Sequence, residues 1–562
     1  MTRQKPKRLL ALFSSSSRAN VLASGAVLTG LGVGLTAVSG EVFRVKPHQP
    51  LPIPARHQGD KQTETEKLKA AIGHVSQELK RLAEKAGETS AEIFEALEMI
   101  LQDESLFDAA ITEIESGWEA ATAFVNAVET FAELLSGDPT FEERLADIRD
   151  LAKRVAANIH GISLGLDLPE EGRFVIVGED FSPADTAQFT KAVVGVITIQ
   201  GGPTSHTAII CRSKAIPAVV SCASAADLVD GVAVLVDPVG DRVVVGGKES
   251  DATQAITFVA KSSEPIIPVR ANIGSLEDAI AAATTAAEGV GLFRTELLYL
   301  QSTAKPSKEK QIAAYTEILK AAPEGPIVVR TIDAGSDKPV PFLEMPKEEN
   351  PALGVRGFRL VVPHREFIID QLQSLEEARA QSGREVWVMA PMVALATEAA
   401  QFSELARSAG NFKVGIMVET PSIIYEIPNL KGIVDFISVG TNDLSQYLFA
   451  SDRLHPSLGS LLNPWQPALI RALSEIAKEC KAVSIYSGVC GESASDPAFA
   501  VVLAGMGFDS VSSSRSQVGA VRTALSSLDQ AQAREIYLAV SEAKTSDEAK
   551  SIALAKLSLL AS

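Results

Sequence analysis

Apolar and polar positions follow two different patterns in the first half of the chain. Short β-branched apolar runs, typical of strands, occur between residues 21 and 60 and again between 166 and 250. Between residues 61 and 165 the apolar positions recur every three or four residues, which is the period of amphipathic helices. The first β segment is too short to form a core of its own. We therefore expect it to join residues 166–250 in one α/β domain, with the helical stretch inserted into it.

Residues 251–562 alternate apolar strands with helical stretches. Eight strands are predicted: Val269–Gly274, Gly289–Glu296, Ile327–Asp333, Val386–Val393, Val414–Thr420, Phe436–Asp443, Val483–Glu492 and Phe508–Ser513. Eight such units predict a (β/α)₈ barrel of the TIM type, whose chemistry lies where strands end at the C-terminal face. The predicted fold is thus a multidomain α/β protein, and residues 1–20 stay unassigned.

Composition limits the possible partners and compartments. The 562 residues contain 70 Asp and Glu against 52 Lys and Arg, a net charge of −18 that argues against a nucleic-acid partner. The cysteines lack C-x-x-C spacing, so we expect no zinc site or disulfide framework and place the protein in a reducing cytoplasm. Val21–Val38 is nearly uncharged but rich in Gly, Ser and Thr, and we expect no stable membrane insertion.

One histidine lies at a turn suited to phosphate. Gly201, Gly202 and Pro203 break the predicted strand Val193–Ile199, and Thr204 and Ser205 are good N-cap residues for the segment that follows. His206 would lie in the first helical turn, where free N–H groups and the helix dipole favour an anionic group. On this turn alone, a structural histidine and a phosphate-carrying one are equally compatible with the sequence.

Arginines follow two of the barrel strands directly. Arg294 and Arg330 come at strand ends, and Arg453 follows shortly after another strand. Three guanidinium groups at one mouth could bind a phosphate and a carboxylate bidentately. Alternatively, Arg294 and Arg330 could form structural ion pairs with Glu296 and Asp333. Considered singly, each arginine is better explained by a structural ion pair. Considered together at the mouth of one barrel, the two arginines favour ligand binding.

Two carboxylates and a thiol end other strands of the predicted barrel. Glu419 and Asp443 follow consecutive strands and together describe a magnesium site that leaves positions for water and substrate oxygens. Cys490 lies in a glycine-flanked turn after a strand, so its thiol could reach into the mouth of the barrel. A small buried side chain without a chemical role is an equally good interpretation of Cys490.

Several separate motifs together resemble one known family. They occur in consistent order between about Leu28 and Ser513: Gly201-Gly-Pro-Thr-Ser-His206-Thr-Ala, Pro346-Lys-Glu-Glu-Asn-Pro-Ala-Leu-Gly354, Ile416-Met-Val-Glu-Thr-Pro421, Asp435-Phe-Ile-Ser-Val-Gly-Thr-Asn-Asp-Leu-Ser-Gln-Tyr447 and Gly488-Val-Cys-Gly-Glu492. The chain closely resembles Enzyme I of the bacterial phosphotransferase system, which is phosphoenolpyruvate–protein phosphotransferase.

The resemblance implies a role for each candidate residue. His206 would be phosphorylated on a ring nitrogen, Glu419 and Asp443 would bind Mg²⁺, and Cys490 would protonate the enolate to give pyruvate. The residues implied to contact phosphoenolpyruvate are Arg294, Arg330, Arg356, Asn442, Asp443 and Arg453.

The resemblance also implies the partners and the domain roles. Residues 61–165 correspond to the docking domain for the phosphocarrier protein HPr, and the barrel would make the protein a homodimer. Residues 21–60 and 166–250 would form a phosphohistidine domain that swivels on linkers near Pro47–Gly59 and Gly246–Ser263. The reaction would be the first step of sugar uptake by the phosphotransferase system.

A few positions depart from the family pattern without affecting a predicted catalytic residue. Cys211 stands where a small aliphatic residue is usual, Ser221 where glycine is common, and His455 where asparagine is usual. Three alternatives to the family function are an ATP-dependent dikinase or phosphoenolpyruvate synthase, a catalytically idle regulatory homologue, and a TIM-barrel binding protein with a structural histidine. The absence of a glycine-rich nucleotide loop disfavours the dikinase, and the complete set of transfer residues disfavours the regulator.

Overall fold

The computed structural model divides the chain into two compact units. The first comprises the described residues within 1–46, 167–180 and 189–253, and the second those within 47–166, 181–188 and 254–562. The structure describes residues 22–34, 36–45, 55–57, 60–85, 97–135, 139–162, 166, 168–202, 205–253, 256–299, 304–335, 340, 342, 343, 345, 348–452 and 455–561.

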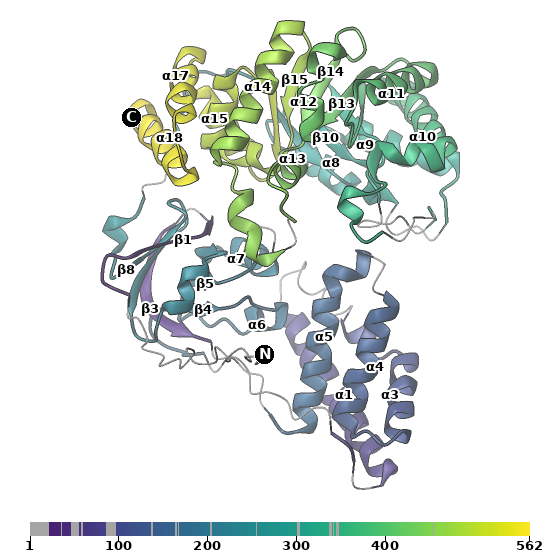
Figure 1. Cartoon of the computed structure of the whole chain (residues 1–562), viewed down its shortest axis with the longest axis vertical. Helices are drawn as coiled ribbons and strands as arrows, with labels where there is room; N and C mark the ends of the chain where they lie inside the picture. The colour runs from purple at the N-terminus through teal and green to yellow at the C-terminus, as the bar shows by residue number, and fades with distance from the viewer. Residues whose placement is uncertain are drawn as a thin grey trace, which may run out of the picture. The chain divides into compact units, whose positions relative to one another are not determined.

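The first unit is built on a mixed eight-stranded sheet (Figure 1). Its strand order is β1-β8-β7-β3-β4-β5-β6-β2, and the four strands from β3 to β6 run parallel to one another. Valine and isoleucine dominate these strands and are buried in a shared core, which suits β-branched side chains. The elements are β1 Val27–Thr29, β2 Leu31–Val33, β3 Val38–Arg44, β4 Phe174–Gly178, β5 Val193–Thr198, α7 His206–Ser213, β6 Ala218–Val220, η1 Ala223–Asp227, β7 Ala233–Asp237, β8 Arg242–Val245 and η2 Glu249–Asp251.

A group of helices lies between β3 and β4 in the sequence. These helices pack on one another around an apolar core of their own (Figure 1). Since β3 and β4 are hydrogen-bonded neighbours in the sheet, the helices interrupt it in sequence, and the prediction of an inserted helical domain is confirmed. The helices are α1 Lys61–Lys85, α3 Glu104–Glu115, α4 Ala120–Leu135 and α5 Pro139–Ile159, and the short α6 Pro183–Ala187 follows β4.

The eight predicted barrel strands form a closed parallel barrel, as expected for the TIM fold. The strands are β9 Val269–Ile273, β10 Val290–Arg294, β11 Ile327–Arg330, β12 Val386–Ala390, β13 Lys413–Val418, β14 Phe436–Val439, β15 Tyr486–Val489 and β16 Ser510–Ser514. The α-helices are α8 Leu276–Ala283, α9 Lys308–Ala321, α10 Val361–Ser382, α11 Ala396–Ala409, α12 Pro421–Ile424, α13 Thr441–Leu448, α14 Pro467–Val483, α15 Pro497–Met506, α16 Val518–Ser526, α17 Gln530–Ser541 and α18 Ser546–Ala561. The 3₁₀ helices are η3 Thr295–Leu298, η4 Pro351–Leu353, η5 Gly357–Leu360, η6 Ile427–Leu430, η7 Pro456–Leu462 and η8 Glu492–Ser495.

Large side chains fill the inside of the barrel. The interior cluster consists of Leu292, Val328, Trp387, Met389, Met417, Phe436 and Cys490. A second, larger core lies between the strands and the surrounding helices. The barrel is therefore a packed core rather than a pore, and a ligand can reach its polar groups only at the two ends.

Several predicted strands extend too far. β11 ends at Arg330 and β14 at Val439, so Asp333 and Asp443 lie beyond the last paired residues instead of inside strands. Asp443 belongs to the first turn of α13. The predicted strand Val483–Glu492 begins inside α14 and ends inside η8. Ile332 extends the apolar pattern past the last paired residue of β11, whereas Gly440 and Thr441 already lead from β14 into α13.

The uncharged segment near the N-terminus forms strands. Its described residues contribute β1 and β2 and the start of β3. Among the helices in the described parts of the chain, none is long and apolar enough to cross a membrane.

Candidate active site

The predicted histidine turn forms as the sequence indicates. His206 is the first residue of α7, and Ser205 is its N-cap, whose Oγ accepts a hydrogen bond from Ala208 N at 3.3 Å. The free N–H groups of this helix start lie at the histidine, as an anion site requires. Pro203 and Thr204 lie outside the described residues, and of His206 only the backbone is described.

Two side chains that the sequence prediction did not assign hold this turn. Asp180, which follows β4, accepts a 2.5 Å hydrogen bond from Thr207 Oγ1. Ser221 Oγ donates to the carbonyl of Gly201, which has a φ of +85°. Ser221 itself has a φ of +54°, a conformation that favours glycine. The backbone thus accounts for the common glycine at this family position, and the serine adds a hydrogen bond there.

Arg294 and Arg330 are neighbours at the end of the barrel strands. They end β10 and β11 and are partners in the parallel register. Arg294 is exposed, whereas Arg330 is only 5% exposed and pairs with Glu296 and with Asp333 at 3.1 Å. The ion-pair alternative therefore holds for Arg330, but Glu296 pairs with Arg330 instead of the expected Arg294. Burial disfavours the charged guanidinium, yet the surrounding carboxylates together raise the pKa of Arg330.

Asp333 bridges two buried guanidinium groups. Besides Arg330, it contacts Arg356, whose Nη2 lies 3.0 Å from Asp333 Oδ2. Nη1 of Arg356 lies 3.2 Å from Asp443 Oδ1, and the arginine is 1% exposed. Two carboxylates therefore hold the orientation of the Arg356 guanidinium and pair its buried positive charge.

Glu419 is buried, and only one of its two carboxylate oxygens has a hydrogen-bond partner among the described residues. The side chain is fully buried, and its Oε1 accepts a 2.7 Å hydrogen bond from Met392 N. Its Oε2 is buried and has no hydrogen-bond partner among the described residues. Burial, followed by the charges of Asp443 and Asp333, raises the pKa of Glu419 to about 8. The charges of Arg330 and Arg356 lower this pKa, but not enough to offset burial and the neighbouring carboxylates.

The buried charges at this end of the barrel do not balance. Four buried carboxylates surround two buried arginines, so full ionisation leaves an excess of two negative charges, and the carboxylates are Glu296, Asp333, Glu419 and Asp443. One divalent cation would neutralise this excess. In the described part of the chain no three His, Cys, Asp or Glu side chains come together as a metal site. Two carboxylates with open positions for water and substrate oxygen are nevertheless how Mg²⁺ is commonly bound, so the residues fit.

Cys490 and Asn442 lie just after two further barrel strands. Cys490 directly follows β15, is 3% exposed, and its Sγ lies 3.5 Å from the carbonyl of Val439. Burial raises its pKa to about 11, so it is a thiol near neutral pH. Asn442 is exposed and accepts a 3.1 Å hydrogen bond from Glu492 N. Arg453 lies outside the described residues.

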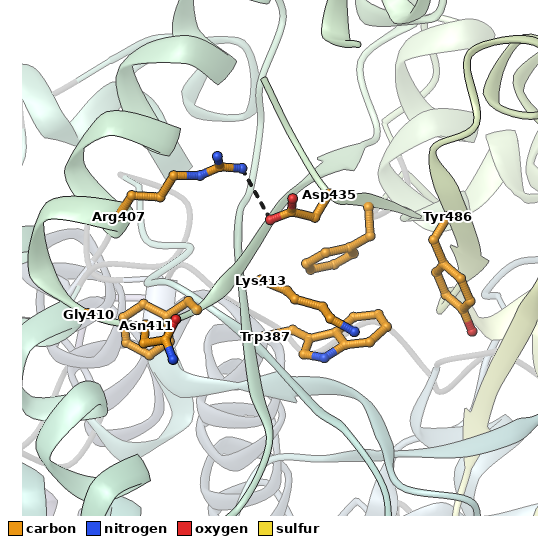
Figure 2. A pocket seen from close by; sticks show the side chains of 9 residues that line it. Trp387, Arg407, Gly410, Asn411, Lys413, Asp435 and Tyr486 are labelled. Carbon is orange, nitrogen blue, oxygen red and sulfur yellow. Dashed lines mark hydrogen bonds and ion pairs between the residues drawn. The ribbon is translucent and has the colours of Figure 1, made fainter. Parts of the chain in front are cut away.

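A cavity of about 520 Å³ lies at the opposite end of the barrel (Figure 2). Trp387, Lys413, Phe436 and Tyr486 line it from the first or second positions of their strands. Lys413 pairs with Glu385 at 3.1 Å, and Arg407 pairs with Asp435 at 3.2 Å. Its cations are therefore already neutralised, and the cavity is separate from the polar cluster.

Comparison with known proteins matches three parts of the chain to one group of enzymes. Residues 248–530 match the model of the PEP-binding domain of PEP-utilising enzymes, residues 170–240 their mobile domain, and residues 29–144 their N-terminal domain. The phosphoenolpyruvate-protein phosphotransferase of Streptomyces coelicolor is 37% identical over 94% of this chain and 99% of its own length. The protein of that name from Bacillus subtilis is 31% identical over 93% of this chain and 98% of its own length.

The fold and the matched domains define a PEP-utilising enzyme. More narrowly, the chain belongs to the phosphoenolpyruvate–protein phosphotransferase family. Among solved structures, an Enzyme I fragment described as nEIt is 30% identical over 40% of this chain and 94% of its own, with a TM-score of 0.35.

The buried arginine gives a direct test of the charge cluster. We expect Arg356→Met to lower the free energy of unfolding by about 3–5 kcal/mol, because it removes the buried guanidinium that pairs with both Asp333 and Asp443. The matched variant Arg407→Met removes an exposed pair with Asp435 and should cost less than about 1 kcal/mol. Urea unfolding of both variants measures the difference. Equal, small losses would contradict the described pairing.

Proposed function

We propose that this enzyme transfers the phosphoryl group of phosphoenolpyruvate to His206 and then to the phosphocarrier protein HPr, releasing pyruvate. The observation that carries the proposal is the polar cluster at the strand ends of the barrel. It combines arginines in register with an excess of buried negative charge that a divalent cation would balance. An anionic substrate and a metal together suit this arrangement, since phosphoryl transfer depends mainly on positioning and charge neutralisation.

The arginines are suited to the two anionic groups of phosphoenolpyruvate. Arg294 is exposed at its strand end and has no ion pair among the described residues. Arg330 beside it is held by Glu296 and Asp333, so its direction is set before substrate arrives. We assign these two arginines, with Arg356, Arg453, Asn442 and Asp443, to substrate binding. Guanidinium groups bind phosphate and carboxylate bidentately.

We assign a divalent cation, Mg²⁺, to Glu419 and Asp443. The unpartnered Oε2 of Glu419 supports this assignment, because a buried carboxylate oxygen without a partner is costly. When bound, the cation would neutralise charge on the substrate oxygens during transfer.

His206 supplies the nucleophile for the first transfer. A neutral ring nitrogen donates its electron pair to phosphorus while the bond between phosphorus and the enol oxygen breaks, leaving the enolate of pyruvate. The Cys490 thiol then donates its proton to the methylene carbon of the enolate, and the resulting thiolate regains a proton from solvent. The raised pKa of Cys490, about 11, keeps that proton available near neutral pH.

His206 must meet two partners in turn under this proposal. The unit that carries it would swivel between phosphoenolpyruvate at the barrel and HPr at the inserted helices.

We further propose that the barrel forms a homodimer. Several large apolar side chains on segments that follow the barrel strands are more than half exposed, among them Leu353, Val362, Leu395 and Tyr425. We place the enzyme in the cytoplasm, at the first step of sugar uptake.

Replacing the histidine tests the transfer directly. We expect radiolabelled phosphoenolpyruvate with Mg²⁺ to label the wild-type chain with an acid-labile, base-stable phosphate, and His206→Ala to abolish the label. His74→Ala, which changes an exposed histidine on α1, should label normally. Adding HPr should remove the label from the wild-type chain, because the labelled phosphoryl group is transferred to HPr.

Persistent labelling of His206→Ala would contradict the proposed phosphohistidine. Labelling that depends on ATP would favour a dikinase instead. A wild-type chain that never becomes labelled would point to a binding or regulatory protein.

The thiol has a separate test. We expect Cys490→Ala to slow pyruvate formation by about tenfold or more, because general acid groups commonly contribute at least this much, with little change in phosphoenolpyruvate binding. Cys480→Ala, another buried thiol on α14, should leave the rate unchanged. A coupled lactate dehydrogenase assay measures pyruvate. Unchanged turnover in Cys490→Ala would contradict the proton-donor role.

A further inference from the structure

A fully buried amide on α10 joins the ends of two barrel strands. Gln371 Oε1 accepts a hydrogen bond from Ile332 N at 3.0 Å. Its Nε2 donates to Thr295 Oγ1 at 3.0 Å and to Tyr315 OH at 3.1 Å, with a longer contact of 3.4 Å to Tyr299 OH. The N–H of Ile332 can only donate, so it fixes the amide oxygen on its side and the NH₂ group toward the hydroxyls.

The amide orientation determines the direction of the next hydrogen bond. Since Thr295 Oγ1 accepts from Gln371, its own proton is free to donate to the carbonyl of Arg330 at 2.8 Å. Gln371 therefore holds the backbone on both sides of Thr331, through Thr295 on one side and Ile332 on the other. Each of these groups is at most 5% exposed, so no water competes for the bonds.

A second branch leads away from the strands. Tyr315 OH accepts from Gln371 and can donate to Tyr299 OH at 2.5 Å. Tyr299 OH donates to Gln311 Oε1 at 2.9 Å, and Gln311 Nε2 donates to Pro306 O at 3.2 Å. Gln311 thus belongs to the same buried network but does not contact a strand end.

The strand ends that Gln371 joins carry the two arginines in register. Thr295 directly follows Arg294, and the carbonyl that Thr295 binds is that of Arg330. The next residue, Glu296, pairs with the Arg330 guanidinium. A shift of one strand end against the other would therefore change the spacing of both guanidinium groups.

We propose that Gln371 is a positioning residue that sets the spacing of Arg294 and Arg330 for the phosphate of phosphoenolpyruvate. This inference rests on the proposed function, in which those arginines bind the substrate. Displacements of about 1 Å at a reacting site can change rates by about 10²-fold, so a distant buried amide can control substrate binding through backbone geometry.

The test compares two equal changes within one network. We expect Gln371→Leu to raise the KM for phosphoenolpyruvate by about tenfold, equivalent to the loss of one well-placed contact, while the KM for HPr stays unchanged. Gln311→Leu removes a buried amide from the same network and should leave the KM for phosphoenolpyruvate unchanged. A merely structural role would lower the melting temperature and the fraction of active enzyme without changing KM.

A KM for phosphoenolpyruvate that shifts equally in both variants, or in neither, would overturn the positioning role. Should Gln371→Leu fail to fold, Thr295→Val removes only the hydroxyl that joins Gln371 to the Arg330 carbonyl. A wild-type KM for phosphoenolpyruvate in Thr295→Val would then overturn the inference. A wild-type chain that forms no pyruvate from phosphoenolpyruvate would instead refute the proposed function.

Discussion

The site depends on one carboxylate between two buried arginines. Asp333 contacts both Arg330 and Arg356, and these guanidinium groups are in turn held by Glu296 and Asp443. A buried charge is costly unless it is paired. Each ion pair therefore holds the orientation of the side chains that form it. The buried carboxylates outnumber the buried arginines, and this excess supports the proposal that a cation and an anionic substrate bind here together.

The barrel makes this arrangement possible. Closure of eight parallel strands brings residues from separate parts of the sequence to one end, and the parallel register places Arg294 beside Arg330. The packed interior keeps the polar cluster apart from the cavity at the other end. Gln371 links this rigid frame to the site, because it bonds to the backbone N–H of Ile332 and to the hydroxyl of Thr295, which in turn binds the Arg330 carbonyl.

Much of the fold follows from local sequence signals. Apolar β-branched runs identify the eight barrel strands, and Ser205 marks the start of α7 because it can cap a helix. Because strand ends carry the chemistry in TIM barrels, Arg330 and Glu419 are recognisable from their positions alone. The ion-pair partners of these side chains, in contrast, cannot be predicted from local sequence. That Glu296 pairs with Arg330 and not with Arg294 depends on the register of two strands, which no local pattern records.

The Gln371 network also lies beyond sequence interpretation. A glutamine on a helix is usually exposed, and only the packing of α9 against α10 buries this one beside Thr295. The strand boundaries were overestimated for a related reason, because hydrogen bonding between strands and not the local sequence decides that β11 ends at Arg330 and β14 at Val439. Tertiary contacts decide both features.

The excess of negative charge provides the most direct test of the account. Calorimetric titration of phosphoenolpyruvate into the His206→Ala variant measures binding to the barrel without transfer. We predict that removing Mg²⁺ with a chelator weakens binding by at least about tenfold, since the buried carboxylates would then lack the cation that offsets their excess negative charge beside an anionic substrate. Equal affinity with and without the cation would contradict the account.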